Sequence, residues 1–198
     1  THVAGIIAAT RNNDIGMYGI ASTAEIMCLR AVPNEGDEYD KDVGLFIWYA
    51  ADNGAQIINM SFGKDFSPHN DKVREAIVYA ASKGVLLVNA AGNDSVDIDS
   101  VYSYPSDRLN NEPEVSSNFI TIGAIGPVKN PLMVAPFSNY GKENVDLFAP
   151  GAIIYAPVPS DKYEALSGTS MAAPAVSGVA AILLSYYPKL SPEAIRKA

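Results

Sequence analysis

The chain has 198 residues, of which 48% are hydrophobic and 18% are charged, and its formal net charge is −8. This composition is typical of one globular domain and excludes a disordered or fibrous chain. The acidic balance argues against nucleic acid as a partner, and no apolar run reaches the roughly 20 residues that cross a bilayer. We therefore expect one domain over residues 1–198, with neither a nucleic-acid partner nor a membrane span in this segment.

Hydrophobic periodicity and turn residues predict that helices and strands alternate along the chain. The predicted elements, in chain order, are a short helix at 1–9, a strand at 24–32, a helix at 40–53, a strand at 55–62, a helix at 69–83, strands at 85–91, 119–125 and 145–148, and a long helix at 169–187. This alternation favours an α/β fold with a mainly parallel sheet that is buried on both faces. The long polar segment 94–118 is predicted as a loop that is either functional or partly ordered by its own turns.

Cys28 is the only cysteine, so no disulfide can form within the chain. It lies in the predicted buried strand 24–32, and we expect it to be a small core side chain. The paired Cys and His spacings of a zinc site are absent, so the sequence predicts no such metal site.

The most informative stretch is 168–174, Gly-Thr-Ser-Met-Ala-Ala-Pro, at the start of the last long helix. Unpaired N–H groups and the positive end of the helix dipole favour an anion beside Ser170. The small neighbours leave room for a substrate backbone, so Ser170 is a candidate nucleophile. In a generic sequence, a Ser or Thr at such a position is more often an N-cap of a core helix.

This string matches position by position, and therefore resembles, the nucleophile signature of the subtilisin-like serine proteases, the subtilases. The resemblance extends over nearly the whole chain. It implies a three-layer α/β/α fold of the subtilisin type and hydrolysis of peptide bonds through an acyl-enzyme on Ser170. It also implies a peptide or protein substrate and a secreted or cell-envelope location.

Two further segments share the resemblance. Asn93 stands just past a predicted parallel strand, where ligands bind in α/β sheets, and it matches the oxyanion-stabilising Asn of subtilases. The family's substrate walls match Ser61, Phe62 and Gly63 on one side and Ala90, Ala91 and Gly92 on the other. Taken alone, Asn93 is more often a turn former, and 61–63 is more often a strand end. The pair Tyr104-Pro105 resembles a family pair with a cis peptide bond.

The resemblance also indicates what the chain lacks. Residues 1–5 match the tail of the family motif His-Gly-Thr-His-Val-Ala-Gly, so His2 corresponds to its second histidine, which is not the base. His69 begins a predicted surface helix and is not expected to act as a base either. We expect a catalytic domain truncated at its N-terminus and also at its C-terminus. Without the catalytic Asp, His and N-terminal strands, it is inactive alone and exposes a sheet edge that favours self-association.

Three alternatives stay open at this stage. A structural calcium ion near Asn12, Asn13 and Asp14 is implied by the resemblance, although its other ligands would come from segments absent here. The acidic run 35–40 either favours basic side chains in the substrate or is simply a solvated loop. The alternative to a protease is a pseudoprotease that binds peptides without cleaving them.

Overall fold

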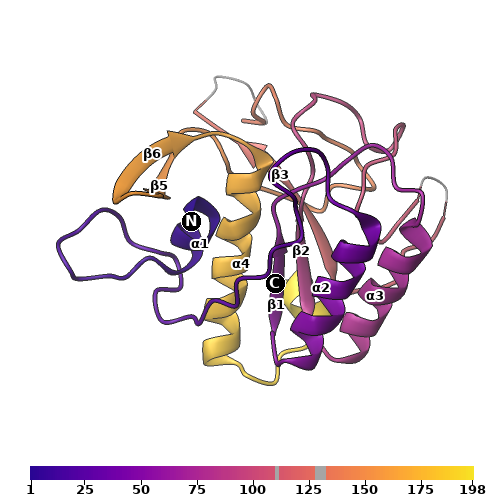
Figure 1. Ribbon diagram of the computed structural model, residues 1–198, viewed down its shortest axis with the longest axis horizontal. Coiled ribbons are helices and arrows are strands. Elements are labelled where there is room, and N and C mark those ends of the chain that lie inside the picture. Colours follow the sequence, from indigo (N-terminus) through magenta and orange to yellow (C-terminus); the bar gives the residue numbers. More distant parts are fainter. Residues whose placement is uncertain (110–111, 128–132) are drawn as a thin grey trace.

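Four parallel strands form the central sheet of the computed structural model, which describes residues 1–109, 112–127 and 133–198. The strands lie in the order β1–β2–β3–β4, with bounds Ile57–Met60, Leu86–Ala90, Phe119–Ile125 and Leu147–Pro150. Figure 1 shows helices on both sides of this sheet. The expected three-layer α/β/α architecture with a mainly parallel sheet is therefore confirmed.

Strand β2 shows why the sheet lies at the centre of the molecule. All five of its residues are buried. Leu87 belongs to the apolar cluster on one face, whereas Leu86 and Val88 belong to the cluster on the other face. A strand that is apolar on both faces needs a layer of helices over each face, which is the arrangement observed.

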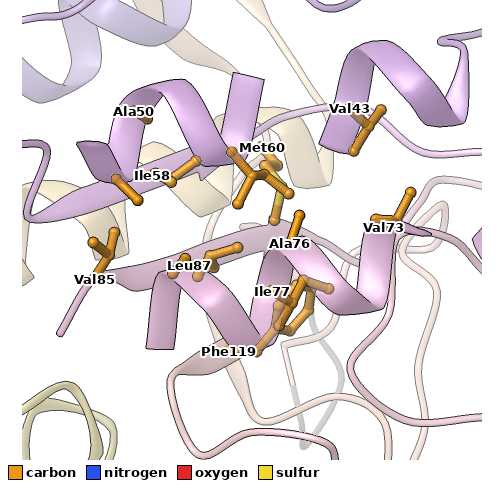
Figure 2. Packing of buried hydrophobic residues seen from close by; sticks show 13 residues of the cluster. Val43, Ala50, Ile58, Met60, Val73, Ala76, Ile77, Val85, Leu87 and Phe119 are labelled. Carbon is orange, nitrogen blue, oxygen red and sulfur yellow. The ribbon is translucent and has the colours of Figure 1, made fainter. Parts of the chain in front are cut away.

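The first face is covered by α2 (Asp40–Asp52) and α3 (Asn70–Ser82), whose bounds agree with the prediction to within one residue. Figure 2 shows the buried side chains between these helices and the strands, including Val43, Ile77 and Met60. Each fully buried side chain of this size contributes about 1.5–3 kcal/mol of transfer free energy. Helix α3 is followed by Gly84, whose positive φ of 74° lets the N–H of Val85 donate to the carbonyl oxygen of Ala80 and close the helix end.

The second face is covered mainly by α4 (Thr169–Tyr186), which packs against all four strands and against α1 (His2–Ala8). Ala172 and Ala173 are fully buried, and their small side chains let the helix approach the sheet closely. The short helix α5 (Pro192–Arg196) adds Ile195 to the same core cluster. By length and composition alone α4 could cross a membrane, but here it is the core helix of an α/β layer.

The predicted strand at 24–32 is wrong: this segment runs extended and pairs with no strand of the described chain. Cys28 is therefore exposed, which overturns its expected role as a core side chain. Ile26 and Met27 are exposed as well, at 42% and 43%. The β-type pattern is present, but a strand also needs a neighbouring strand for its backbone hydrogen bonds.

The sequence prediction also missed an antiparallel hairpin of β5 (Ile154–Val158) and β6 (Lys162–Leu166). Its turn has Ser160 and Asp161 at positive φ, the backbone that tight hairpins prefer. Glycine usually marks such turns, and its absence here explains the omission. The prediction of β4 at 145–148 was shifted by two residues from the observed strand.

Candidate active site

Three segments that lie far apart in the sequence meet at one edge of the sheet. Ser61 follows the carboxyl end of β1, Asn93 follows that of β2, and Ser170 is the second residue of α4. Because β1 and β2 are parallel, their carboxyl ends share an edge, and α4 begins at that edge. Hydrogen bonds join Ser61 to Ser170 and Asn93 to Thr169, so the structure brings these predicted site residues together.

The hydroxyl of Ser170 is partly buried and donates to the carbonyl oxygen of Ser61 over 3.2 Å. In return, the Ser61 hydroxyl donates to the carbonyl oxygen of Ser170 over 2.9 Å. The N-cap of α4 is Gly168, which has no side chain to cap the helix, and the N–H of Thr169 donates to the side chain of Asn93 instead. Ser170 is therefore not the capping residue of a core helix, and its hydroxyl is held at the helix N-terminus by backbone contacts.

A buried polar chain supports the Ser61 side of the site. Asn59 donates from Nδ2 to the Ser61 hydroxyl over 2.9 Å, and its Oδ1 accepts from the Ser177 hydroxyl over 3.0 Å. Ser177 lies two turns along α4 from Ser170 and is 2% exposed. This chain fixes the end of β1 against α4 through side chains as well as through packing.

The side chain of Asn93 is oriented by Thr169. Its Oδ1 accepts from the Thr169 backbone N–H over 2.8 Å and from the Thr169 hydroxyl over 3.1 Å. These two bonds use the acceptor side of the amide, and its Nδ2 donates no hydrogen bond within the described residues. Nδ2 is thus left as a donor near Ser170: a Cβ on Gly168 would lie 3.6 Å from Asn93 Nδ2 and 3.7 Å from the backbone N of Ser170. Donors that converge on one point are what stabilisation of an oxyanion requires.

Sequence reasoning missed the roles of two buried side chains at this edge. Thr169 is completely buried, and besides orienting Asn93 it accepts from the N–H of Gly92 over 3.1 Å. Asn139 is 3% exposed and makes hydrogen bonds on both sides of Asn93. The Asn of Phe-Ser-Asn-Tyr-Gly, at 137–141, carries no local pattern that would mark it, because its partners lie more than 40 residues earlier.

The predicted substrate walls lie at the carboxyl ends of the neighbouring strands β1 and β2. Ser61 and Phe62 are partly buried and Gly63 is exposed, while Ala90 and Ala91 are buried and Gly92 is partly buried. Beyond Gly63, the backbones of Lys64 and Tyr104 exchange two hydrogen bonds of 3.0 and 2.9 Å. The Tyr104–Pro105 peptide bond is cis, as predicted.

The acidic run 35–40 divides into a buried part and an exposed part. Asp40 and Lys64 form a buried ion pair of 2.7 Å, and Lys64 also donates to the carbonyl oxygen of Glu38. Burial raises the pKa of Asp40, but hydrogen bonds from Lys64 and from the His69 backbone outweigh it and hold that pKa below its usual value. Only Glu35 and Asp37 remain as fully exposed carboxylates of this run.

Neither histidine contacts Ser170. The ring of His2 is buried, and its Nε2 lies 3.1 Å from the carbonyl oxygens of Ile154 and Glu164, which ties α1 to the β5–β6 hairpin. His69 is the exposed N-cap of α3, and its backbone N–H donates to Asp40. Since the chain has no other histidine, Ser170 has no imidazole base here.

The predicted calcium loop does not by itself fit the ion. Asn13 Oδ1 already accepts from the N–H of Ile15 over 3.2 Å, and Asp14 is the loop's single carboxylate. Calcium takes six to eight oxygen ligands, and the described residues contain no group of three His, Cys, Asp or Glu that could hold a metal. Calcium near Asn12 stays a prediction, and no chemistry is derived through it.

The three-layer fold is that of subtilisin-like serine proteases. The model of the Subtilase family matches residues 1–198. The chain is 40% identical over 185 residues to the thermophilic serine proteinase of Bacillus sp. (strain AK1), covering 93% of this chain and 42% of that protein. It is 39% identical over 190 residues to the cell wall-associated protease of Bacillus subtilis (strain 168), covering 96% and 19% respectively.

Comparison with solved structures points to the same kind of protease. A protease of Pseudoalteromonas arctica PAMC 21717 matches with a TM-score of 0.85 and 30% identity, over all of this chain and 61% of that one. The chain therefore belongs to the subtilase family of serine proteases. It spans less than half the length of either curated relative.

Proposed function

We propose that the chain carries the nucleophile and the oxyanion donors of a serine endopeptidase of the subtilisin type. The observation that supports this most strongly is the position of Asn93, whose Oδ1 is held by Thr169 so that Nδ2 is left to donate beside Ser170. The Ser170 N–H, second in α4, has no hydrogen bond within the described residues and is the other donor.

In the proposed reaction, Ser170 Oγ attacks the carbonyl carbon of a peptide bond. The carbonyl oxygen becomes an oxyanion that accepts from Asn93 Nδ2 and from the Ser170 N–H. The substrate backbone lies along Ser61–Gly63, where it adds as an extended strand. Collapse of the intermediate releases the amine and leaves an acyl group on Ser170, which water then removes.

The first step needs a base to take the Oγ proton, and the amine needs an acid to leave. Among the described residues, the Ser170 hydroxyl makes one hydrogen bond, to the Ser61 carbonyl oxygen, which cannot accept a proton at neutral pH. We therefore propose that the 198-residue chain alone does not hydrolyse peptides, and that a His and an Asp from elsewhere in the protein complete the triad.

A chimera tests both proposals. The part of the thermophilic serine proteinase that precedes the stretch matching this chain is joined ahead of the chain. We expect the chimera, but neither the 198-residue chain nor the chimera with Ser170→Ala, to react stoichiometrically with a fluorophosphonate and to cleave casein. The intact proteinase is the positive control.

Rapid labelling of Ser170 in the 198-residue chain would contradict the proposed dependence on an outside base. A folded chimera that is never labelled would overturn the protease assignment. If such a chimera still bound peptides in a titration, the peptide-binding pseudoprotease would replace the protease. The missing contact between Ser170 and an imidazole is the observation that keeps this second function in view.

Three further proposals concern the location of the protein, its self-association and its substrate specificity. A secreted or cell-envelope location is supported by the relative that is named as cell wall-associated. Self-association is supported by the free edge of β1, which pairs with no strand among the described residues, and light scattering after size exclusion tests it. Exposed Glu35 and Asp37 would favour basic residues in a substrate, and cleavage profiling of the active chimera without such a preference would exclude this.

A further inference from the structure

One buried side chain underlies the loop that carries Asn93. Asn139 Oδ1 accepts from the N–H of Asp94 over 2.8 Å and from the N–H of Val96 over 3.2 Å. Its Nδ2 donates to the carbonyl oxygen of Ala91 over 2.9 Å. A single side chain that is 3% exposed thus satisfies three backbone groups, on both sides of the oxyanion candidate.

The backbone of Asn139 makes a fourth contact with this loop. Its N–H donates to the carbonyl oxygen of Gly92 over 3.0 Å. Gly92 has a φ of 100°, which only glycine adopts readily, and a Cβ there would collide with Asn139 Nδ2. The backbone of residues 91–96 and the side chain of Asn139 therefore pack closely, with no room for a larger residue at Gly92.

The sheet anchors Asn139 in turn. The Ser138 hydroxyl donates to the Asn139 carbonyl oxygen over 2.8 Å and accepts from the N–H of Ala124 over 2.9 Å. Ala124 lies in β3, whose seven residues are buried or nearly so. Through these hydrogen bonds, Asn139 fixes residues 91–96 relative to the buried strand β3.

We infer that Asn139 is a positioning residue of the oxyanion site: it holds residues 91–96 in the conformation that presents Asn93 Nδ2 to the reacting carbonyl. The inference rests on the proposed function above. Thr169 fixes the amide of Asn93 from the side of α4, and Asn139 fixes its backbone from the side of the sheet. Misplacement of a catalytic group by about 1 Å is enough to cost about a hundredfold in rate.

The first experiment needs no activity and uses the 198-residue chain. The side-chain NH₂ signal of Asn93, assigned by its loss in Asn93→Ala, is recorded by ¹⁵N–¹H NMR in Asn139→Ala. The matched control is Asn118→Ala, since Asn118 is also 3% exposed and donates to a backbone oxygen, that of Val85, at the opposite edge of the sheet.

Both variants are expected to lower the melting temperature. Only Asn139→Ala is expected to shift and broaden the Asn93 signal, and an unchanged signal in a folded variant would overturn the inference. If Asn139→Ala does not fold, Asn139→Asp decides by the same signal. Its side chain still accepts from Asp94 and Val96, but it places an acceptor oxygen against the carbonyl oxygen of Ala91 in place of the donor, so the Asn93 signal is again expected to shift.

The second experiment is a double-mutant cycle in the active chimera. Asn139→Ala is expected to lower kcat on the order of 10- to 100-fold with little change in KM, and less than about twofold when Asn93→Ala is already present. An equal loss in both backgrounds, or an equal loss in Asn118→Ala, would show a purely structural role. An inactive unsubstituted chimera would refute the proposed function, while the NMR result would still decide the role of Asn139.

Discussion

The edge around Ser170 and the segment 24–32 are built in opposite ways. At the edge, each functional residue is tied to a distant part of the chain, as Ser61 is to Ser170 and Asn93 to Thr169. The segment 24–32 runs extended with no strand partner in the described chain, and most of its residues are exposed. Only Leu29 of this segment packs partly against the core of the first face.

The difference shows that an apolar pattern and a fixed conformation are separate properties. The segment 24–32 has the pattern of a strand but lacks the partner that would satisfy its backbone. The edge consists of loops, yet buried Asn and Thr side chains satisfy its backbone groups one by one. Site geometry is therefore expected to respond strongly to single polar substitutions, and the extended segment is expected to tolerate them.

The largest expected effect follows from removing the oxyanion donor. Asn93→Ala in the active chimera should lower kcat roughly a hundred- to a thousandfold, a magnitude carried over from the loss of this donor in a subtilisin. The melting temperature should fall as well, because completely buried Thr169 loses the acceptor of its N–H and hydroxyl bonds, but the chimera should stay folded at the assay temperature. Steady-state kinetics measures the change in kcat, and thermal unfolding of the same preparation measures the change in melting temperature. If activity were lost only because the variant unfolded, the edge around Ser170 would no longer differ from the segment 24–32 in having a specific catalytic geometry.

The next effect concerns the backbone of the edge. Gly92→Ala should lower the free energy of unfolding by about 3–4 kcal/mol, because it combines a positive φ with a clash against Asn139. The matched control is Gly84→Ala, since Gly84 also has a positive φ but its Cβ would meet open space. The control should cost only about 1 kcal/mol. Urea titrations measure both, and equal losses would mean that the packing on Asn139 adds nothing.

A third effect concerns a buried carboxyl group that lacks the donors seen at the edge. Asp107 is 7% exposed, and its Oδ2 has no hydrogen-bond partner in the described residues. Burial, together with the charges of Glu114 and Asp146 and against the opposing charge of Arg196, raises its pKa to about 7. The folded state therefore binds a proton that the unfolded state releases between about pH 4 and pH 7.

The sign of the pH dependence follows. The contribution of Asp107 to stability is fully present below about pH 4 and is lost as the pH rises to about 7. Relative to Asp107→Asn, the unsubstituted chain should lose about 3 kcal/mol of unfolding free energy between pH 4 and pH 8. Urea titrations at both pH values give this difference. A difference that does not change with pH would show that the carboxyl group is ionised throughout.

Much of the fold could be predicted because its signals are local. Helices α2, α3 and α4 have their apolar spacing and end signals within their own sequence, and β3 was predicted at its observed bounds. Helix α4 also carries Ser170 within a string of seven residues, so the candidate nucleophile could be read directly.

The rest depended on partners far away in the sequence. Asn139 contacts residues 91–96, and Thr169 contacts Asn93 across 76 positions, so no window of sequence shows their roles. The expected burial of Cys28 was wrong for the same reason, because burial of 24–32 required a neighbour that the described chain does not place there. The local apolar pattern predicts where a helix or strand can form, and contacts with distant residues decide whether that segment is paired and buried.

The smallest expected effect tests the extended segment itself. Cys28 is exposed and is the only cysteine, so a thiol reagent such as Ellman's should label the folded chain as fast as the chain unfolded in guanidinium. Cys28→Ser should change the free energy of unfolding by less than about 0.5 kcal/mol, because it removes no buried contact. Labelling that slows as the protein concentration rises would show that a second copy covers the segment. Slow labelling at every concentration would contradict the exposure of Cys28 and would mean that the segment 24–32 is as firmly fixed as the edge around Ser170.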